Sequence, residues 1–435
     1  MGVITTTTTI LEEKQDRNSS SRSTSVSHIK CAIYNIYIHS LSKFPGPKLW
    51  TASRLPFIYY LLTGQLVKKV KEFHDIYGEF YRLAPDGVSF ASEQAWNDIY
   101  TFRRGHKRAL RDKVWYIAPN NQADNLITTT DFEFHARARG LMSNSLMDEA
   151  LRTQYPLIES HADMLISKVR GAAEKPDNLI EGEQRQHSAY AEKTINRRLD
   201  AKSDRPDFMT PFMRNNSILK ICPGRNREGI VSTFNFIVVG GSETSARVMT
   251  GIFSHLTKKK NKRILDRLRD DIRTKFKEER EITLDAIQST PIHYLEAVIN
   301  EGLRMCNPIP SGLPRVVPEG GDDYCGTFLS GGQTRLAVRT YATNRSKKIF
   351  ADPDEFVPER WLPKDHQPMK YANDQLSASK PSSVGFHSCL GRPLAWADIR
   401  LAVTRLLWMF HFSVDGEDEV DFDEFPVIMI IQKHL

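Results

Sequence analysis

The segment from about Glu228 to Leu256 constrains the fold most strongly, because it predicts one long helix with a single apolar stripe. The residues on this stripe recur at steps of three and four: Ile230, Phe234, Ile237, Gly241, Thr244, Val248 and Ile252. Gly240 and Gly241 each cost roughly 0.8 to 1 kcal/mol relative to alanine inside a helix. Close helix packing would offset that cost, and this stretch alone favours it. The alternative is a groove where a flat ligand or small molecule approaches the backbone, with Glu243 and Thr244 as a proton-delivering acid and alcohol.

A single cysteine near the C-terminus is a second candidate for chemistry. Cys389 stands between Gly385 and Gly391, just ahead of a segment whose apolar stripe predicts a helix. A thiol at a helix N-terminus ionises more readily, which makes it a better metal ligand or nucleophile. A lone cysteine is more often an inert buried thiol, so both interpretations remain open for Cys389 in isolation.

A charged pair is the third feature. Glu301 and Arg304 lie three residues apart in a helix that we expect to begin near Pro291. An exposed pair of this kind contributes only about 0.2 to 0.5 kcal/mol. The pair becomes important only if a third charge, such as Arg360, joins it in a buried network in which every partner is satisfied.

Composition excludes several classes of protein. The chain has 435 residues, enough for up to three domains or for one large domain. Its net charge of +7 is a modest excess that suits acidic protein partners or anionic lipid, and it is too diffuse to indicate nucleic-acid binding. The five cysteines share no CxxC spacing, so neither zinc nor a disulfide framework is indicated. No run of eighteen apolar residues occurs, so we expect no membrane-spanning helix.

Local patterns predict a mainly helical chain with small sheets. Residues 1–30 are polar and are expected to form a disordered leader. The spacing of apolar residues predicts a helix that stops at Gly78, followed by a hairpin formed by residues 79–83 and 88–90. Residues 174–190 are polar and aperiodic, which predicts a loop, and residues 258–280 predict an amphipathic surface helix. Further short strands are expected between residues 313 and 340.

Four motifs, taken in order, resemble the signature set of the cytochrome P-450 haem-thiolate monooxygenases. They are Gly240-Gly241-Ser242-Glu243-Thr244-Ser245, Glu301-x-x-Arg304, Pro358-Glu359-Arg360-Trp361 and Gly385-x-His387-x-Cys389-x-Gly391. The sequence around these motifs, including residues 44–48, 307–315 and 350–361, resembles that of fungal members of the family that act in secondary metabolism. The resemblance runs from about Ile33 to Phe412. It implies the cytochrome P-450 fold, α+β and mainly α, with residues 31–435 forming one large haem-binding domain.

The resemblance assigns a role to each motif residue. Cys389 looks like the axial thiolate ligand of the iron in haem b, whose electron donation favours O–O cleavage. Thr244 and Glu243 resemble the alcohol and acid that deliver protons. Gly240 and Gly241 would let the haem and oxygen lie close to the helix.

Other residues resemble groups that hold the cofactor or the core. His135 and Arg139, in the pattern His-x-x-x-Arg, look like a haem-propionate motif, and Arg315 and His387 match positions that bind the same propionates. Three more residues resemble a buried structural ion-pair triad: Glu301, Arg304 and Arg360.

The implied reaction inserts one oxygen atom of O2 into a hydrophobic small molecule and reduces the other to water. The electrons come from NADPH through NADPH-cytochrome P-450 reductase, for which Arg392 and Arg400 are candidate docking residues. The substrate is expected to be a fungal secondary metabolite, a terpenoid or polyketide. We expect a monomer that binds no nucleic acid and lies peripherally on the endoplasmic reticulum membrane or in the cytoplasm.

The sequence also departs from the family pattern. Ser382 replaces a usual aromatic residue, and His387 replaces the commoner arginine. Arg139 and Thr244 are only 105 positions apart, so the middle of the chain is expected to lack helices that roof the substrate pocket. The polar leader stands where an anchor helix is usual. Two alternatives follow: a non-catalytic or decayed haem-binding homologue, and a haem-thiolate isomerase or dehydratase.

Overall fold

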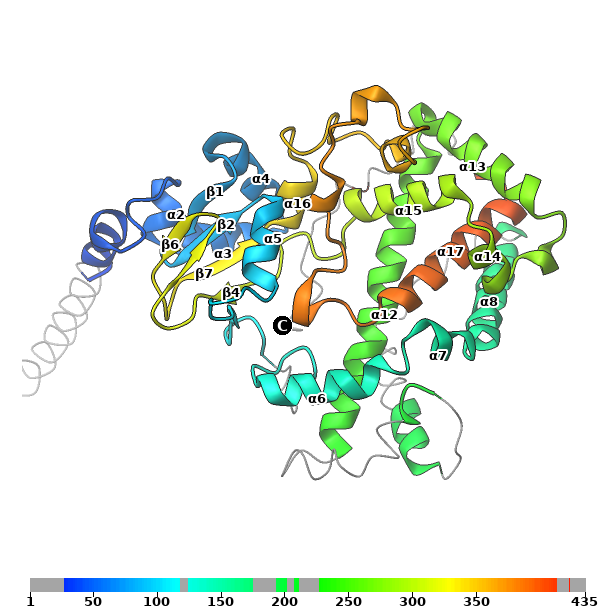
Figure 1. Ribbon diagram of the computed structural model, residues 1–435, viewed down its shortest axis with the longest axis horizontal. Coiled ribbons are helices and arrows are strands. Elements are labelled where there is room, and N and C mark those ends of the chain that lie inside the picture. Colours follow the sequence, from blue (N-terminus) through cyan, green and yellow to red (C-terminus); the bar gives the residue numbers. More distant parts are fainter. Residues whose placement is uncertain are drawn as a thin grey trace, which may run out of the picture.

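The computed structural model describes residues 27–117, 124–174, 193–201, 207–210, 227–412 and Phe422. Most of these residues are helical (Figure 1). The longer helices are α3 (Leu55–Leu62), α4 (Leu66–Tyr77), α5 (Glu93–Tyr100), α6 (Phe132–Ser143), α8 (Tyr155–Glu174), α12 (Arg227–Thr257), α13 (Lys262–Lys275), α15 (His293–Met305) and α17 (Arg392–Met409). Shorter helices are η1 (Tyr34–Ile38), α2 (Lys48–Ala52), α7 (Asp148–Arg152), α14 (Leu284–Ser289), α16 (Thr340–Asn344), and the 3-10 turns η3 (Lys259–Asn261), η4 (Glu279–Glu281), η5 (Pro358–Trp361), η6 (Met369–Tyr371), η7 (Leu376–Ala378) and η8 (Gly385–His387).

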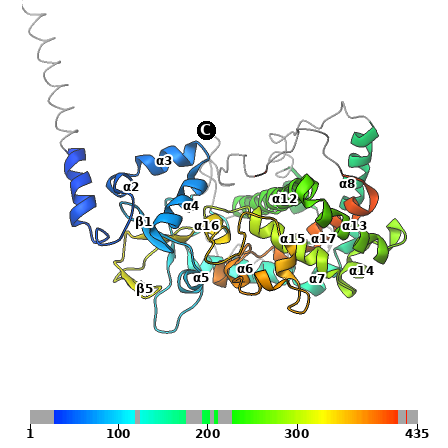
Figure 2. The same ribbon diagram turned by 90° about the horizontal axis from the view of Figure 1, so that it is seen from above.

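A five-stranded sheet lies on the opposite side of the molecule from the main helical part (Figures 1 and 2). Its strand order is β1 (Phe80–Ala84), β2 (Gly87–Phe90), β7 (Arg335–Val338), β4 (Arg315–Val316) and β3 (Leu110–Arg111). Strands β2 and β7 are parallel, and the other pairs are antiparallel. A separate hairpin joins β5 (Asp322–Tyr324) and β6 (Thr327–Leu329). The prediction of a mainly helical chain with small sheets is confirmed.

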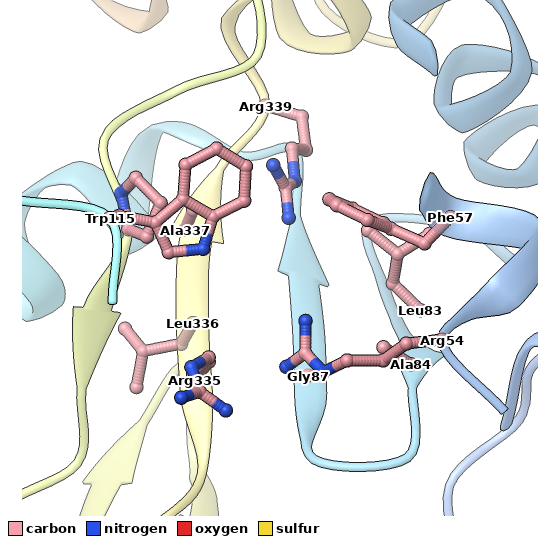
Figure 3. Close-up of a pocket in the computed structure, with 11 residues that line it drawn as sticks. Arg54, Phe57, Leu83, Ala84, Gly87, Trp115, Arg335, Leu336, Ala337 and Arg339 are labelled. Carbon is pink, nitrogen blue, oxygen red and sulfur yellow. The ribbon is translucent and has the colours of Figure 1, made fainter. Parts of the chain in front are cut away.

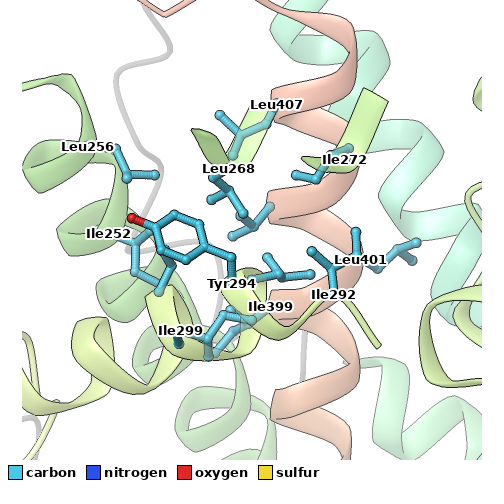
Figure 4. Packing of buried hydrophobic residues seen from close by; sticks show 14 of the residues in the cluster. Ile252, Leu256, Leu268, Ile272, Ile292, Tyr294, Ile299, Ile399, Leu401 and Leu407 are labelled. Atoms are coloured by element: carbon cyan, nitrogen blue, oxygen red, sulfur yellow. The ribbon is translucent and has the colours of Figure 1, made fainter. Parts of the chain in front are cut away.

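The largest core lies among α12, α13, α15 and α17. Figure 4 shows its buried side chains meeting from several helices, including Ile252, Leu268 and Leu401. Helix α12, predicted from residues 228 to 256, spans 31 residues and contributes to this core near its C-terminal end. Helix α13 buries residues at the expected four-residue spacing and keeps its charges outside, so the amphipathic prediction for this segment is confirmed.

The predicted helix and hairpin near the start of the body are also confirmed. Helix α4 ends at Tyr77, and Gly78 follows with a φ of +92°, which only glycine adopts easily. Strands β1 and β2 pair antiparallel directly afterwards. The hairpin therefore forms the edge of the sheet that leads, through β7 and β4, toward the middle of the molecule.

Some expectations fall at the limits of the described chain. Residues 27–30, expected to belong to a disordered leader, are helical and continue into η1, so that boundary was wrong. Residues 1–26 and 175–190 lie outside the described residues, as do two further stretches in the middle of the chain, 202–206 and 211–226. No helix in the described ranges combines the length and apolarity that crossing a bilayer requires.

Candidate functional site

The turn before Cys389 requires glycine at one position. Gly385 has a φ of +72°, and a Cβ there would lie 2.0 Å from the carbonyl oxygen of Tyr100. The backbone of this turn therefore lies directly against the end of α5. The Cys389 N–H donates a hydrogen bond of 2.8 Å to the Ser382 carbonyl, which closes the loop just before α17 begins. Cys389 is consequently presented at the start of α17, as the sequence predicted.

The surroundings of the Cys389 sulfur act on its charge in opposite directions. Cys389 is exposed on one side, but protein surrounds the rest of the sulfur, and this desolvation raises the pKa of the thiol. The backbone N–H groups of Gly391 and Arg392 and the guanidinium of Arg139 counteract part of that rise. The result is a thiol with donors already directed at it, which a metal ion would convert to a thiolate.

Arg139 also holds the loop itself. Its Nη1 and Nη2 atoms donate to the carbonyl and the hydroxyl of Ser388, at 2.7 and 3.1 Å. Both terminal nitrogens are thus committed to the residue before Cys389. Arg139 can contribute to an anion site mainly through its charge, while its hydrogen bonds orient the cysteine loop.

Two buried arginines face each other on neighbouring strands beside this loop. Arg111 on β3 is directly opposite Arg315 on β4. Like charges in this arrangement destabilise a sheet. Arg111 donates to the carbonyls of Leu126 and Thr129, and Arg315 donates to the Tyr116 hydroxyl at 2.7 Å, so neither partner set contains a carboxylate. Among the described residues, no Asp or Glu forms an ion pair with either guanidinium.

Two histidines lie beside these arginines. The rings of His135 on α6 and His387 in η8 lie 4.5 Å apart. Burial, followed by the charges of Arg111 and Arg139, lowers the pKa of His135 to about 3. Burial and the charges of Arg111 and Arg315 likewise lower the pKa of His387. The Nδ1 atom of His135 is buried and has no hydrogen-bond partner among the described residues.

An aromatic stack joins α6 to the cysteine loop. The rings of Phe132 and Phe386 stack with centroids 4.4 Å apart, and the Arg108 guanidinium lies 4.1 Å from the Phe132 centroid. Sequence reasoning missed Arg108, Arg111 and Tyr116. They stand outside the recognisable motifs, and only the pairing of β3 with β4 reveals that Arg111 belongs to the site.

These residues fit an anionic ligand better than they fit one another. The site has four arginines (Arg108, Arg111, Arg139 and Arg315) and a buried, unpartnered histidine nitrogen, and none of these arginines has a carboxylate partner within the described chain. Burying such charge without a counterion is costly. A group with two carboxylates, such as the propionates of haem, matches this donor set.

The two glycines of α12 are not explained by helix packing. An added Cβ at Gly241 would meet no described atom within 4 Å, and one at Gly240 would meet only the Phe236 ring, at 3.7 Å. Close packing on this helix occurs instead at Gly251, where a Cβ would lie 2.3 Å from the Cys306 sulfur. The interpretation of Gly240 and Gly241 as packing residues, favoured by the sequence of this stretch alone, is therefore wrong for the described residues.

The predicted acid and alcohol lie just after these glycines on α12. The Thr244 hydroxyl donates a 2.5 Å hydrogen bond to the Gly240 carbonyl, one turn earlier, and the residue is half-buried. Glu243 is exposed. Farther toward the N-terminus of α12, Phe234 and Ile237 pack in a cluster with Leu390, the neighbour of Cys389. This cluster connects α12 to the cysteine loop.

The charged pair of α15 does join a third charge. Glu301 accepts hydrogen bonds from Arg304 at 2.7 and 2.8 Å, from Arg360 at 3.2 Å and from the Trp361 indole at 2.8 Å. The three charged side chains are fully buried. Burial raises the pKa of Glu301, but Arg304 and Arg360 outweigh it, so the pKa is lowered. Arg360 has a second acidic partner, Asp374.

Comparison with known proteins identifies the class to which this site belongs. The family model for Cytochrome P450 matches residues 177–435. The chain is 30% identical to cytochrome P450 monooxygenase aclL of Aspergillus oryzae, over 89% of this chain and 90% of the relative. It is also 30% identical to versicolorin B desaturase of Aspergillus parasiticus, with the same coverage, and 29% identical to averantin hydroxylase of Dothistroma septosporum, over 88% of this chain and 82% of the relative.

The chain therefore belongs to the cytochrome P450 family, and its relatives are fungal enzymes of secondary metabolism. It is a monooxygenase that oxidises a small molecule, and its family carries a haem-thiolate cofactor. The alignment with the Aspergillus oryzae relative runs over 457 positions, more than the 435 residues of this chain. That relative accordingly has residues without a counterpart here, which agrees with a shortened chain.

Proposed function

We propose that the Cys389 thiolate would hold the iron of haem b and that the enzyme oxidises a hydrophobic secondary metabolite, a terpenoid or polyketide. The observation that carries this proposal is the group of arginines without carboxylate partners beside the Cys389 loop. When bound, the haem supplies activation of O2, with one oxygen atom going to the substrate and the other to water. NADPH supplies the electrons through a reductase.

In this proposal, four residues on four elements would receive the propionates: Arg111, Arg315, His135 and His387. Arg111 and Arg315 supply hydrogen-bonding cations from the sheet, and Arg139 adds charge while it orients the loop through Ser388. The unpartnered Nδ1 of His135 is available to a propionate oxygen. Two carboxylates held there would offset the repulsion between the two opposed arginines.

Helix α12 would control proton delivery. The hydrogen of Thr244 is held on the Gly240 carbonyl, which leaves the hydroxyl oxygen free to accept a hydrogen bond from water. The exposed carboxylate of Glu243 can exchange protons with solvent. Gly240 and Gly241 leave room above the helix for the reacting groups.

We assign a structural role to Glu301, Arg304 and Arg360. Arg304 donates to the carbonyls of Asn344, Pro353 and Glu355, so the network ties α15 to α16 and to the chain before η5. Fully satisfied buried networks of this kind specify one arrangement of the chain. They support residues 31–435 acting as one haem-binding domain.

One surface supports peripheral attachment to the endoplasmic reticulum membrane rather than a purely cytoplasmic location. Leu49 on α2 is 70% exposed, and Leu55 and Leu62 on α3 are 72% and 62% exposed. Tyr37 and Ile38 of η1, the helix that precedes α2 in the chain, are also exposed. These elements lie at the end of the molecule away from the main helical core (Figure 1). Flotation with phosphatidylcholine vesicles should recover the protein, and a Leu55→Ser, Leu62→Ser double variant should be recovered less.

The two arginines expected at the reductase surface differ in availability. Arg400 forms a bidentate ion pair with Glu296, with both distances 2.7 Å, so it is a poor docking residue. Arg392, at the start of α17, is exposed. We therefore retain Arg392 as the docking candidate on a monomeric enzyme.

Turnover with labelled oxygen tests the reaction. The purified enzyme is combined with a cytochrome P450 reductase, NADPH, a panel of terpenoids and aromatic polyketides, and 18O2. We expect one labelled oxygen atom in the product, and less product per NADPH consumed for Thr244→Ala than for the unaltered enzyme. Product formed without NADPH, or product with oxygen from water, would contradict a monooxygenase reaction.

A further inference from the structure

Helix α3 presents an apolar face to solvent. Its eight residues, Leu55–Leu62, include no charged side chain. Four of them recur at steps of three and four and are exposed: Leu55, Ile58, Tyr59 and Leu62. A helix at the surface of a globular protein normally turns polar side chains outward. Because α3 does the opposite, its outer face remains uncovered by the described residues.

The inner face of α3 is fixed to the sheet, which holds the apolar face outward. Phe57 packs in one cluster with Leu83 of β1 and lines a small pocket beside the sheet (Figure 3). This pocket has room for about one water molecule, so no exposed side chain of α3 can turn inward to fill it. Arg54, which precedes the helix, forms an ion pair with Asp86 in the turn between β1 and β2. The helix therefore cannot rotate to bury its outer stripe without breaking these contacts.

The helix formed by residues 27–38, which ends with η1, extends this apolar surface. Ile29, Ile33 and Tyr37 recur at steps of four, and all three are exposed. Helix α2 packs against both η1 and α3, and its Leu49 is exposed as well. Figures 1 and 2 show these helices together at one end of the molecule. Exposed apolar side chains thus continue over three neighbouring helices.

The same stretch of chain is strongly basic. Residues 27–71 contain seven Lys and Arg and no Asp or Glu, although the whole chain has 53 Asp and Glu. Three of the seven cations form ion pairs with later residues: Arg54, Lys69 and Lys71. The other four are exposed and have no carboxylate partner in the described parts of the chain: Lys30, Lys43, Lys48 and Lys68. We call these four lysines, together with the exposed apolar side chains, the N-terminal surface.

We propose that the N-terminal surface binds an anionic lipid bilayer, with its apolar side chains below the headgroups and its lysines among them. This inference rests on the peripheral attachment proposed above and adds the charge of the lipid. Helices that carry apolar and basic side chains lie in the plane of a bilayer in this way, and exposed tyrosines favour its interface. Each lysine near an anionic membrane surface strengthens binding. A fluid bilayer can also cover apolar side chains that are spread over three helices.

Binding of the full-length haem-loaded enzyme to two kinds of vesicle tests the proposal. One kind is phosphatidylcholine alone, and the other is equal parts of phosphatidylcholine and phosphatidylserine. Flotation over a range of lipid concentrations should show at least about tenfold tighter binding to the anionic vesicles. Added salt should reduce this preference, because it screens the attraction between the lysines and the headgroups.

The outcomes separate this inference from the proposed attachment. Equal affinity for the two kinds of vesicle would overturn the preference for anionic lipid and leave peripheral attachment in place. Binding to neither kind would overturn both. Each result is read from the unaltered enzyme and does not require turnover.

Two matched variants test whether these particular lysines carry the preference. The first replaces the four lysines of the N-terminal surface: Lys30→Gln, Lys43→Gln, Lys48→Gln and Lys68→Gln. The control removes the same charge from exposed lysines outside residues 27–71: Lys277→Gln, Lys347→Gln, Lys348→Gln and Lys364→Gln. We expect the preference to fall to about twofold or less in the first variant and to be unchanged in the control. A preference that survives in the first variant, or disappears in the control, would contradict the proposal.

A second copy of the chain is the alternative occupant of this apolar surface. Sedimentation velocity in the absence of lipid should show a monomer for both the unaltered enzyme and the Leu55→Ser, Leu62→Ser double variant. A dimer that the double variant converts to a monomer would overturn the proposal, because this surface would then be an interface between copies.

Discussion

Arg111 and Arg315 lie directly opposite each other on β3 and β4, and both are buried. Neighbouring like charges in a sheet are unfavourable, and here carbonyl and hydroxyl oxygens are the hydrogen-bond partners in place of carboxylates. The arrangement becomes favourable when a dianion lies between the strand ends and the Cys389 loop. The opposed arginines are therefore the observation on which we base the proposal that this edge of the sheet would receive the haem propionates.

Replacement of one opposed arginine should loosen the haem. We expect Arg315→Gln to retain haem about tenfold less tightly or worse, because a buried charge-assisted hydrogen bond is lost. Arg315→Lys keeps the charge, so its retention of haem should be intermediate between that of Arg315→Gln and that of the unaltered protein. The rate of haem transfer to an excess of a haem-binding acceptor protein measures this. Equal rates for Arg315→Gln and the exposed Arg280→Gln control would contradict the assignment.

Replacement by alanine should have opposite effects on stability at Gly241 and at Gly251, both on α12. Gly241→Ala should stabilise the haem-free protein by about 0.8 to 1 kcal/mol, because the added Cβ meets no described atom within 4 Å. If this open space receives the haem, as we propose, Gly241→Ala should also reduce haem occupancy. Gly251→Ala should destabilise the protein, because its Cβ would meet the Cys306 sulfur at 2.3 Å. Urea denaturation and the absorbance ratio of haem to protein measure both effects.

Removing the charge at the centre of the buried network should strongly destabilise the fold. Glu301→Gln leaves Arg304 and Arg360 without the carboxylate that joins them, and we expect a loss of about 3 to 5 kcal/mol in the free energy of unfolding. Asp266→Asn, which weakens partly exposed pairs with Lys262 and Arg269, should cost at most about 1 kcal/mol. Similar losses for the two variants, measured by denaturant unfolding, would contradict the structural role of Glu301.

Stability of the haem-free protein should fall in mild acid because of His135. The pKa of His135 is lowered from 6.5 to about 3 in the folded protein, so between these values only the unfolded chain binds the proton. The contribution of His135 is therefore complete above pH 6.5 and declines below it, by up to about 1.4 kcal/mol per pH unit. The free energy of unfolding of His135→Phe, measured by denaturant unfolding, should fall less between pH 7 and pH 5 than that of the unaltered protein. An identical pH dependence for the two proteins would contradict the depressed pKa.

Elements with regular spacing were predictable from the sequence, and contacts between distant short elements were not. Helices α12 and α13 follow from the spacing of their apolar residues, and the β1–β2 hairpin follows from its turn. Arg111 was missed because β3 has only two residues, and its significance arises from pairing with Arg315, 204 positions away. The pocket beside the sheet was not predictable for a similar reason: its lining residues come from five separate stretches of chain.

The Cys389 motif was recognisable because residue types and spacing carry the information, whereas the meaning of Gly240 and Gly241 required three-dimensional structure. Their sequence is equally consistent with packing and with an open groove. Only the absence of described neighbours at Gly241, beside the tight contact at Gly251, separates the two interpretations.

The spectrum of the reduced enzyme with carbon monoxide tests the central claim, thiolate ligation by Cys389, most directly. We expect the unaltered protein to bind haem and to show the red-shifted Soret band of a thiolate-ligated complex. Cys389→His should retain haem and show the unshifted band of histidine ligation. An unaltered protein that takes up no haem, or one whose Soret band matches that of Cys389→His, would contradict the account.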